Sequence, residues 1–420
     1  MTMSTETIQG QVADDAVSGD AVHGDAVHGD AVHEDAVGAF AERVFEAALG
    51  AMELQAMYLG DRLGWYAALA ERGPMTAPEL AAATGTAPRY AREWLEHQAV
   101  SGYLTVDDQT APATAPSVSP ATVPAPPVSP ATVPAPPASP ADTRRFRLPP
   151  AHAEVLANPD SLYYLSPLAR FLSATGRQAP ALLDAYRGGG GVSWEQYGAD
   201  AREAQAALNR PLFLRALCQE LLPAAPDVHA RLLAGGRVAD IGCGFGWSSI
   251  GLARGYPGIT VDGYDPDTPS IVDAERNADR YGVGDRVSFH DVDAASVVGK
   301  VADAGEYDVA FAFECVHDMS DPVSVLAAAR RLLRPDGFLV VMDERTEETF
   351  TAPGSPIERL FYGFSVGGCL PDGLSRAPSV GTGTVMRPAT LAGYAAEAGF
   401  SSTEILPIEH EMFRFYRLLP

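Results

Sequence analysis

The sequence predicts an α/β protein in which a mainly parallel sheet follows a mainly helical first half. From Gly235 onward, apolar runs of strand length alternate with helical segments, which is the pattern of a parallel sheet covered by helices. Before that point, from about Ala39, helical periodicity dominates and one pair of short strand-like runs interrupts it. We therefore expect one domain at 39–150, a helical linker or lid region at 151–234 and a second domain at 235–420.

Composition limits the classes of partner. The chain has 420 residues, 46% of them hydrophobic, which allows two packed domains. Its formal net charge of -24 repels phosphate backbones and anionic lipids, so we expect a small-molecule or peptide substrate and neither nucleic acid nor membrane as a partner. The sequence shows no basic-then-apolar signal pattern and no apolar run long enough to span a bilayer, which makes the cytoplasm the expected location.

Cysteine spacing argues against metal and disulfide frameworks. The four cysteines lie far apart, without a CxxC pair or a Cys/His ligand spacing. We therefore expect neither a structural zinc site nor any other metal. The four are Cys218, Cys243, Cys315 and Cys369.

The amino terminus is of low complexity. Between Asp20 and Val37 the unit DAVHG recurs every five residues, a period that fits neither helix nor strand. We interpret residues 1–38 as a disordered repeat tail. The evenly spaced histidines of the repeat could bind a metal, but a solvated tract is the favoured interpretation.

The region 39–150 has the element order of a winged helix. Helical periodicity covers Ala39–Leu59 and Arg62–Arg72. Thr76 then begins a helix with Glu79 three residues on, as in a capping box, and Gly85 ends it. The next helix is PRYAREWLEHQAVSG, and two strand-like runs, SGYLTVDD and RRFRLPP, follow.

A Pro-rich tract at about 111–141 separates those two runs and contains VSPATVPAPP twice in tandem. Such a composition predicts an extended, polyproline-like segment. We interpret it as an insertion at the tip of a hairpin, where extra loop length costs little.

A winged helix suggests DNA binding, but the helix that would read DNA carries Glu93 and Glu96 beside Arg89 and Arg92 and so lacks a basic stripe. We expect this module to form a homodimer and to help enclose a substrate pocket. Further along, the run Gly188 to Gly191 predicts a mobile loop, either a lid or a connector.

A glycine-rich turn is the first motif that indicates chemistry. The apolar strand Val238 to Ile241 runs into GCGFG, whose glycines are Gly242, Gly244 and Gly246, and a helix begins at Trp247. Glycines let the backbone turn sharply and approach a ligand, while the helix amino terminus offers free N–H groups. A carboxylate or a phosphate could bind there, so the turn alone also suits a dinucleotide.

Acidic residues around the turn decide between these ligands. Asp240 lies two residues before Gly242, where it is suited to the cationic end of an amino acid. Asp265 ends the next strand, nineteen positions after Gly246, where its carboxylate can accept both ribose hydroxyls. A third strand ends at Asp291 and Asp293, with Val292 between them, and an acidic group there can accept a hydrogen bond from adenine.

With these residues the chain resembles the class I, Rossmann-like methyltransferases that use S-adenosylmethionine, and the match runs from about Gly235 to Pro420. The resemblance implies that Asp240, Val292 and Asp293, together with the three glycines and Asp265, bind this cofactor. It also implies a seven-stranded sheet with a carboxy-terminal antiparallel hairpin, here SSTEILPI with MFRFYRLL. With the winged helix, the chain looks like a bacterial group of dimeric methyltransferases.

The rest of the pattern agrees with that sheet. YDVAFAFECVHDM is expected to form strand four, DPVSVLAAARRLLRPDG a helix ending at Gly337, and FLVVMDE strand five. Parallel strands present their carboxyl ends to the ligand. The polar residues after these two strands, Glu314, His317, Asp318, Asp343 and Glu344, are therefore the available catalytic groups.

Among them His317 is the preferred general base, because an unshifted imidazole titrates near neutral pH. An alternative is that His317 only orders its loop or touches the cofactor. We expect Glu314, at an apolar strand end, to take part as well. The segment 355–387 supplies Phe361, Tyr362 and Met386 as candidate substrate-pocket residues, although helix packing would explain them equally.

The leading hypothesis is methyl transfer to a small molecule or peptide, with oxygen the favoured acceptor atom, in specialised metabolism. One alternative keeps the fold and cofactor but catalyses a reaction other than methylation. Another is a regulator whose winged helix binds DNA while the second domain senses a metabolite.

Overall fold

The structure is a computed structural model that describes residues 24–107, 143–300 and 302–420. The chain divides into two compact units, one up to Glu53 and one from Leu54 to Pro420. Within the described ranges no helix combines the length and apolarity needed to cross a membrane.

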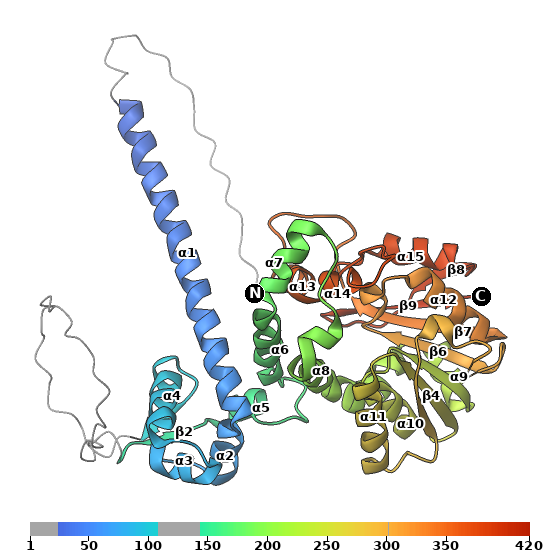
Figure 1. Cartoon of the computed structure of the whole chain (residues 1–420), viewed down its shortest axis with the longest axis horizontal. Coiled ribbons are helices and arrows are strands. Elements are labelled where there is room, and N and C mark those ends of the chain that lie inside the picture. Colours follow the sequence, from blue (N-terminus) through green and yellow to red (C-terminus); the bar gives the residue numbers. More distant parts are fainter. Residues whose placement is uncertain (1–23, 108–142, 301) are drawn as a thin grey trace, which may run out of the picture. The chain divides into compact units, whose positions relative to one another are not determined.

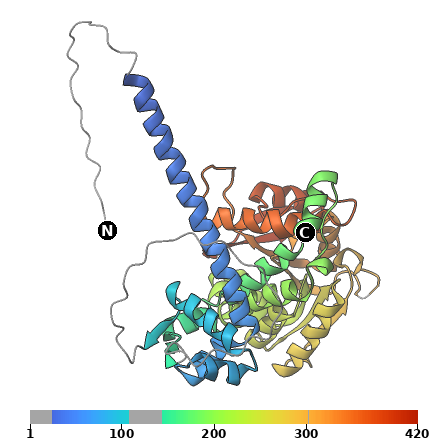
Figure 2. The same cartoon turned by 60° about the vertical axis from the view of Figure 1, so that its left-hand side comes forward.

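Helix α1 (Gly24–Arg62) corrects one expectation, since the last part of the predicted disordered tail is helical. Figures 1 and 2 both draw α1 as one uninterrupted helix. A period of five does not exclude a helix, because adding residues to an existing helix costs far less than starting one. The stretch before Gly24, with the first histidine of the repeat, lies outside the described residues.

The helices α2 (Trp65–Arg72), α3 (Ala77–Thr84) and α4 (Pro88–Val100) follow in the predicted order. The capping box of α3 is confirmed: Thr76 Oγ1 accepts from Glu79 N while the Glu79 carboxylate accepts from Thr76 N. Gly85 ends this helix in the left-handed region, at φ 68°. Trp65 and Trp94 are buried in the core that these helices share, with ring centroids 4.8 Å apart.

The expected strand pair is also confirmed. β1 (Thr105–Asp107) pairs antiparallel with β2 (Arg145–Arg147), and Asp107 lies opposite Arg145. The Pro-rich tract at 111–141 lies outside the described residues. Two segments far apart in sequence thus form a short antiparallel pair.

The region after β2 is helical, as predicted. It contains α5 (Pro150–Leu156), α6 (Ser166–Arg177), α7 (Ala179–Gly188), α8 (Trp194–Pro211), the π-helical η2 (Leu212–Leu221), η3 (Leu222–Ala224) and α9 (Pro226–Leu233). The glycine run begins with the last residue of α7 and leads to α8; its last residue, Gly191, packs against Pro371, and the mobility of the run stays a prediction. A Cβ on Gly191 would lie 1.9 Å from Pro371 O, and Val192 N donates to the same oxygen at 3.0 Å.

A seven-stranded sheet forms the second half of the chain, in the order β5-β4-β3-β6-β7-β9-β8. Its parallel strands are β3 (Gly236–Ile241), β4 (Ile259–Asp265), β5 (Val287–Asp291), β6 (Tyr307–Phe313) and β7 (Leu333–Glu344). β8 (Ser402–Ile405) and β9 (Phe413–Leu419) form the expected antiparallel hairpin at the edge. The order reverses between β3 and β6, so the ligand crevice is expected at their carboxyl ends.

Helices cover both faces of the sheet (Figure 1). On one face, η2, α9, α10 (Trp247–Gly255) and α11 (Thr268–Arg280) pack against the sheet. On the other face lie the short 3-10 turn η4 (Ala294–Ser296), α12 (Pro322–Leu332) and α15 (Pro388–Glu397). The central strands are therefore buried on both sides, as their continuous apolar runs require.

One helix boundary was wrong. The helix expected to end at Gly337 ends at Leu332, and Leu333 already belongs to β7. Pro335 explains the early end, because proline lacks the N–H for a helical bond and disfavours helical backbone in the residue before it. After β7, the inserted segment forms α13 (Pro356–Phe364), the π-helical η6 (Ser365–Cys369) and α14 (Leu370–Gly373).

Candidate active site

The glycine turn joins β3 to α10. Gly242, Gly244 and Gly246 all have positive φ, at 70°, 48° and 76°. A Cβ on Gly242 would approach Cys315 to 2.8 Å, and one on Gly246 would approach Phe289 to 2.5 Å. At Gly244, by contrast, a Cβ would meet nothing within 4 Å. The turn therefore packs closely at both ends and leaves open space at its middle glycine.

Asp240 lies directly below this turn, at the end of β3, and is 1% exposed. Its Oδ2 accepts hydrogen bonds from the hydroxyls of Ser248 and Ser249, at 2.6 and 2.5 Å. Its Oδ1 is buried without a hydrogen-bond partner. Burial raises the pKa of Asp240 to about 6, although the two serine hydroxyls oppose the shift.

Asp265 is the last residue of β4 and forms a hydrogen bond with the backbone of the glycine turn. Its Oδ2 accepts from Gly244 N and its Oδ1 from Asp267 N, both at 2.9 Å. Burial raises the pKa of this carboxyl to about 6 despite the two backbone donors. The structure thus brings Asp265 to the glycine turn.

The end of β5 lies next to β4. Asp291 Oδ2 accepts from the hydroxyl of Thr268 at 2.5 Å, and Val292 N donates to Asp265 O at 3.1 Å. Asp293 is exposed and caps the turn η4, with its Oδ1 accepting from Ala295 N at 2.9 Å. Val292 and Asp293 therefore lie at the expected edge of the sheet, and Asp293 also serves as a cap.

His317 lies after β6 and is 2% exposed. Its Nδ1 is 2.8 Å from Asp343 Oδ1 and 3.0 Å from Glu344 Oε2, both at the end of β7. Its Nε2 is 3.3 Å from Asp318 Oδ1. Burial lowers the pKa of His317, but the three carboxylates outweigh burial and raise it well above its ordinary value. The imidazole is therefore held protonated at neutral pH.

Glu314 begins the same loop with a left-handed backbone, φ 50°, which a side chain adopts at a cost of about 1 to 3 kcal/mol. Its N–H donates to Met342 O at 2.7 Å, and Gln205 Nε2 donates to its Oε2 at 3.4 Å. Its Oε1 has no hydrogen-bond partner. Burial raises the pKa of Glu314 to about 8.

The candidate substrate-pocket residues differ in exposure. Phe361 is 1% exposed and Tyr362 is 38% exposed, both on α13. Met386 is 2% exposed and packs in the hydrophobic core below α12 and α15. Tyr362 OH accepts from Arg387 Nη2 at 3.3 Å.

The chain is similar to known methyltransferases in sequence. Residues 239–339 match a family model described as a methyltransferase domain. The ubiquinone biosynthesis O-methyltransferase of Aromatoleum aromaticum is 30% identical over 186 residues, which cover 42% of this chain and 69% of that enzyme. The chain belongs to the S-adenosylmethionine-dependent methyltransferases.

Two further proteins are similar to this chain, one over a short segment and the other over most of its length. The ubiquinone biosynthesis O-methyltransferase of Azorhizobium caulinodans is 38% identical over 122 residues, 29% of this chain, so the match spans 45% of that enzyme's length. The solved structure of mitomycin 7-O-methyltransferase has a TM-score of 0.63 at 20% identity and covers 92% of this chain and 99% of its own. That structural likeness extends the shared fold to most of the methyltransferase chain.

The residues present fit the methyltransferase cofactor. The unpartnered, buried Oδ1 of Asp240 is an acceptor that an ammonium group could satisfy. The open space at Gly244 leaves room for a ligand against the backbone. Asp265 lies beside both features, and its carboxylate already faces the turn.

Two groups of side chains could hold a metal ion in the methyltransferase. One is His317, Asp343 and Glu344, and the other is His317, Asp318 and Cys369, with the potential ligand atoms of each group within 4.8 Å of one another. Both groups use His317, so the same side chain would have to serve either as a ligand or as a base. The absence of a metal stays a prediction.

Several residues that contribute to the candidate active site were not predicted from the sequence. Ser248 and Ser249 hold Asp240, and their place in the first turn after the glycines is a signal that could have found them. Gln205, on α8, reaches Glu314 from a helix distant in sequence. Burial and the charge of Asp318 raise the pKa of the Cys369 thiol to about 12, although His317 beside it opposes the shift. No local pattern predicts the last two contacts.

Proposed function

We propose that this methyltransferase transfers the methyl group of S-adenosylmethionine to a hydroxyl oxygen of a small molecule in specialised metabolism. The observation that carries the proposal is the buried His317 with its Nδ1 between Asp343 and Glu344. A base beside the acceptor speeds methylation of a hydroxyl by about 10² to 10⁴-fold. The names of the similar enzymes, O-methyltransferases of ubiquinone biosynthesis and of mitomycin, support the same chemistry.

The bound cofactor supplies an electrophilic methyl group on a sulfonium. This chain would bind the cofactor through two kinds of group. The backbone at Gly242, Gly244 and Gly246 would contact it directly. Asp240 would accept a hydrogen bond from its amino group, and Asp265 would accept from its ribose hydroxyls. Val292 and Asp293 would flank the adenine. Fixing donor and acceptor in near-attack geometry accounts for much of the rate, with effective molarities of roughly 10⁵ M in model systems.

His317 would take the acceptor proton. Its Nδ1 is hydrogen-bonded to Asp343, so Nε2, which lies 3.3 Å from Asp318 Oδ1, is the nitrogen that would take the acceptor proton. Because the carboxylates hold the proton on the ring, the competent neutral form becomes abundant only above neutral pH. Glu314 keeps its own proton up to about pH 8 and would orient the acceptor hydroxyl.

The acceptor itself would be largely apolar. Phe361, Tyr362 and Met386 come from the segment that this fold uses for substrate binding, and Tyr362 is the exposed one. On this basis we assign Tyr362 to the acceptor side, with Phe361 buried behind it on α13, whereas Met386 packs in the core below α12 and α15. A charged acceptor would find few partners among such side chains.

The direct test is incubation of the protein with cofactor labelled in its methyl group and a panel of phenolic, aliphatic hydroxyl and amine acceptors. Label transferred to oxygen, with one S-adenosylhomocysteine formed per product, supports the proposal. Product formation without S-adenosylhomocysteine would favour the non-methylation alternative. Rates that persist after dialysis against a chelator would support a reaction without metal, whereas a rate restored only by a divalent cation would assign the His317 group to a metal.

The partner of the chain would be a second copy of itself. The part of α1 up to Glu53 exposes a row of large apolar side chains, each between 44% and 64% exposed, namely Val37, Phe40, Val44, Phe45, Leu49 and Met52. Their spacing of three, four and one residues makes an apolar stripe on a helix. An exposed apolar stripe of this kind is typical of a protein–protein interface. Light scattering should show a dimer that Phe40→Glu with Phe45→Glu converts to monomer, while Glu42→Gln leaves it intact.

The winged-helix assignment for 39–150 supports this structural role more than DNA binding. On α4, Arg89 is paired with Glu93, and Glu96 is paired with Arg144, so acidic groups offset the basic ones. A gel-shift screen showing tight, salt-sensitive DNA binding would overturn this view. We also propose the cytoplasm as the location of the enzyme.

A further inference from the structure

A second glycine turn, residues 380–384, lies against the loop that carries His317. Gly381 and Gly383 in this turn both have positive φ, at 62° and 72°. The turn belongs to the segment between α14 and α15, far from His317 in the sequence. It includes none of the residues assigned above to the cofactor or to the acceptor.

Two backbone hydrogen bonds join this turn to the His317 loop. Val380 N donates to Ser320 O at 3.0 Å, and Gly383 N donates to His317 O at 3.1 Å. The first residue of one segment pairs with the last residue of the other, so the two segments run antiparallel. The Ser320 hydroxyl in turn donates to Gly373 O at 2.8 Å. The loop is thus held on both sides of the catalytic imidazole.

The carbonyl of His317 depends on this outside donor. The 3-10 turn η5 (Val316–Asp318) bonds the carbonyls of residues 315 and 316 internally, at 3.2 and 3.3 Å. His317 is buried, and a buried carbonyl left without a donor is costly. Because Gly383 N supplies that donor, it fixes the backbone from which the imidazole extends.

The close approach at position 383 requires glycine. A Cβ there would lie 2.5 Å from Ser365 Oγ and 3.1 Å from Leu370 Cβ. The φ of 72° adds strain for any side chain. The residue whose N–H reaches His317 therefore cannot carry a side chain without displacing the turn.

Neighbouring elements hold the second glycine turn in place. Thr382 Oγ1 lies 2.9 Å from Tyr394 OH, on α15. Shortly after the turn, Met386 O accepts from Thr346 Oγ1 at 3.1 Å, just beyond β7. The turn is therefore a fixed support for the His317 loop.

The imidazole is fixed at two points. Its Nδ1 is 2.8 Å from Asp343 Oδ1, and the main-chain carbonyl of the same residue is bonded to Gly383 N. Between these anchors, Nε2 lies 3.3 Å from Asp318 Oδ1. A shift of the carbonyl would move Nε2 away from the position at which it takes a proton.

We infer that Gly383, through its backbone N–H, is a positioning residue for His317 in methyl transfer. The inference rests on the proposed function, in which His317 is the base. Gly383 acts through His317 and not on the acceptor itself. Misplacing a reacting group by about 1 Å can cost as much as about 10²-fold in rate, so a support of this kind affects turnover.

The test is Gly383→Ala in the full chain, with Gly399→Ala as the matched control. Gly399 also has a positive φ, 90°, but the nearest atoms to a Cβ there belong to the flexible Arg330 side chain, at 3.7 Å or more. We expect kcat of Gly383→Ala to fall by about tenfold or more while its dissociation constant for S-adenosylhomocysteine stays within about twofold. Gly399→Ala should keep both values. Adding Ser365→Ala, which removes the atom at 2.5 Å, should recover part of the lost kcat.

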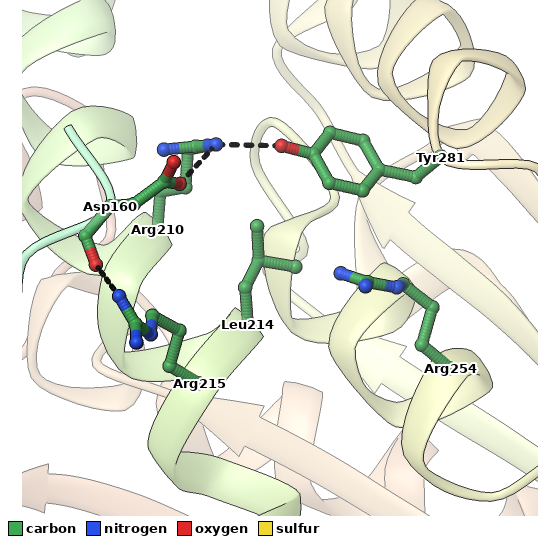
Figure 3. A pocket seen from close by; sticks show the side chains of 6 residues that line it. All are labelled: Asp160, Arg210, Leu214, Arg215, Arg254 and Tyr281. Carbon is green, nitrogen blue, oxygen red and sulfur yellow. Dashed lines mark hydrogen bonds and ion pairs between the residues drawn. The ribbon is translucent and has the colours of Figure 1, made fainter.

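Hydrogen exchange measured by mass spectrometry tests the same contact without turnover. Peptides covering 314–320 should exchange at least about fivefold faster in Gly383→Ala than in the wild type. Arg215→Gln also removes a hydrogen bond to a main-chain oxygen, that of Asp160 at 2.9 Å (Figure 3), and should leave these peptides unchanged.

The two measurements separate this inference from the proposed function. A wild type that transfers no methyl group would remove the proposed function, whereas faster exchange in Gly383→Ala would still support the positioning of His317. Near-normal kcat in a folded Gly383→Ala would overturn the inference. A loss of kcat that Gly399→Ala shares equally would overturn it as well, because the effect would then be general destabilisation.

Discussion

The glycine turn and the His317 group lie at the carboxyl ends of the adjacent strands β3 and β6, but they treat their acidic side chains differently. At the turn, each carboxylate is held by donors close to the turn itself, as Asp265 is by the N–H of Gly244. Around His317, three carboxylates from two strand ends share one imidazole. The first region is built to hold a ligand, and the second to hold a proton.

Substitution of His317 should have the largest effect on turnover. His317→Ala should lower kcat by at least about 10²-fold and leave cofactor affinity unchanged, because a base acts in the transition state. His317→Gln keeps a polar group near the carboxylates and serves as the folding control. Rapid-quench turnover and calorimetry with S-adenosylhomocysteine would measure the two effects. A variant with near-normal kcat would show that positioning alone carries the reaction.

On the cofactor side, Asp265→Ala should weaken cofactor binding by about 1.5 to 3 kcal/mol, roughly tenfold to a hundredfold, because two ribose hydroxyls lose their charged acceptor. Asp273→Ala, at a half-buried position of α11 where the carboxylate pairs with Arg276, removes the same charge away from the turn. Calorimetry on both variants, after circular dichroism has shown them folded, gives the difference. An unchanged dissociation constant for Asp265→Ala would remove this residue from the site.

The role of His317 as a proton acceptor predicts how kcat depends on pH. Because the carboxylates raise the pKa of His317 above its ordinary value of 6.5, and only the neutral ring accepts a proton, kcat should fall with acid starting above pH 6.5. On that limb the rate should drop about tenfold per pH unit. Stopped assays across pH 6 to pH 10 would map the limb, and it should vanish in His317→Gln. A plateau down to pH 6 would contradict the raised pKa.

Fold stability, rather than turnover, distinguishes two glycines of the turn. Gly246→Ala forces a Cβ to 2.5 Å from Phe289 at a φ of 76° and should destabilise the fold by about 2 to 4 kcal/mol. Gly244→Ala meets open space, so it should cost only about 1 kcal/mol of backbone strain while it weakens cofactor binding. Thermal unfolding with and without S-adenosylhomocysteine separates the two. Equal losses of Tm in both variants would mean that the open space at Gly244 has no role.

The sequence predicted what depends on neighbours along the chain. The capping box of Thr76 and Glu79, the strand ends at Asp265 and Asp291 and the hairpin β8–β9 each follow from a local pattern. The pairing of β1 with β2 across the Pro-rich tract was also predictable, because both flanks read as strands. The end of α12 at Leu332 differs from the predicted end at Gly337, because Pro335 already stops the helix.

What escaped prediction depends on packing between distant segments. The spacing of polar residues placed His317, Asp343 and Glu344 at one edge, but no pattern says that both acids would share a single ring nitrogen and shift its pKa. The same holds for Gln205 against Glu314, which are 109 positions apart. Nor does a local pattern predict that Gly191, in the run expected to be mobile, packs against Pro371, which lies 180 residues further on.

The backbone of Glu314 has a consequence for anyone who selects this enzyme for heat resistance. A glycine at that position would adopt φ 50° without steric cost, so a library screened for survival at high temperature should enrich Glu314→Gly. The same exchange deletes the one carboxyl that stands on the loop ahead of His317. Selection for thermal stability would therefore favour glycine at position 314, whereas selection for turnover would favour glutamate. An activity screen has to accompany any stability screen.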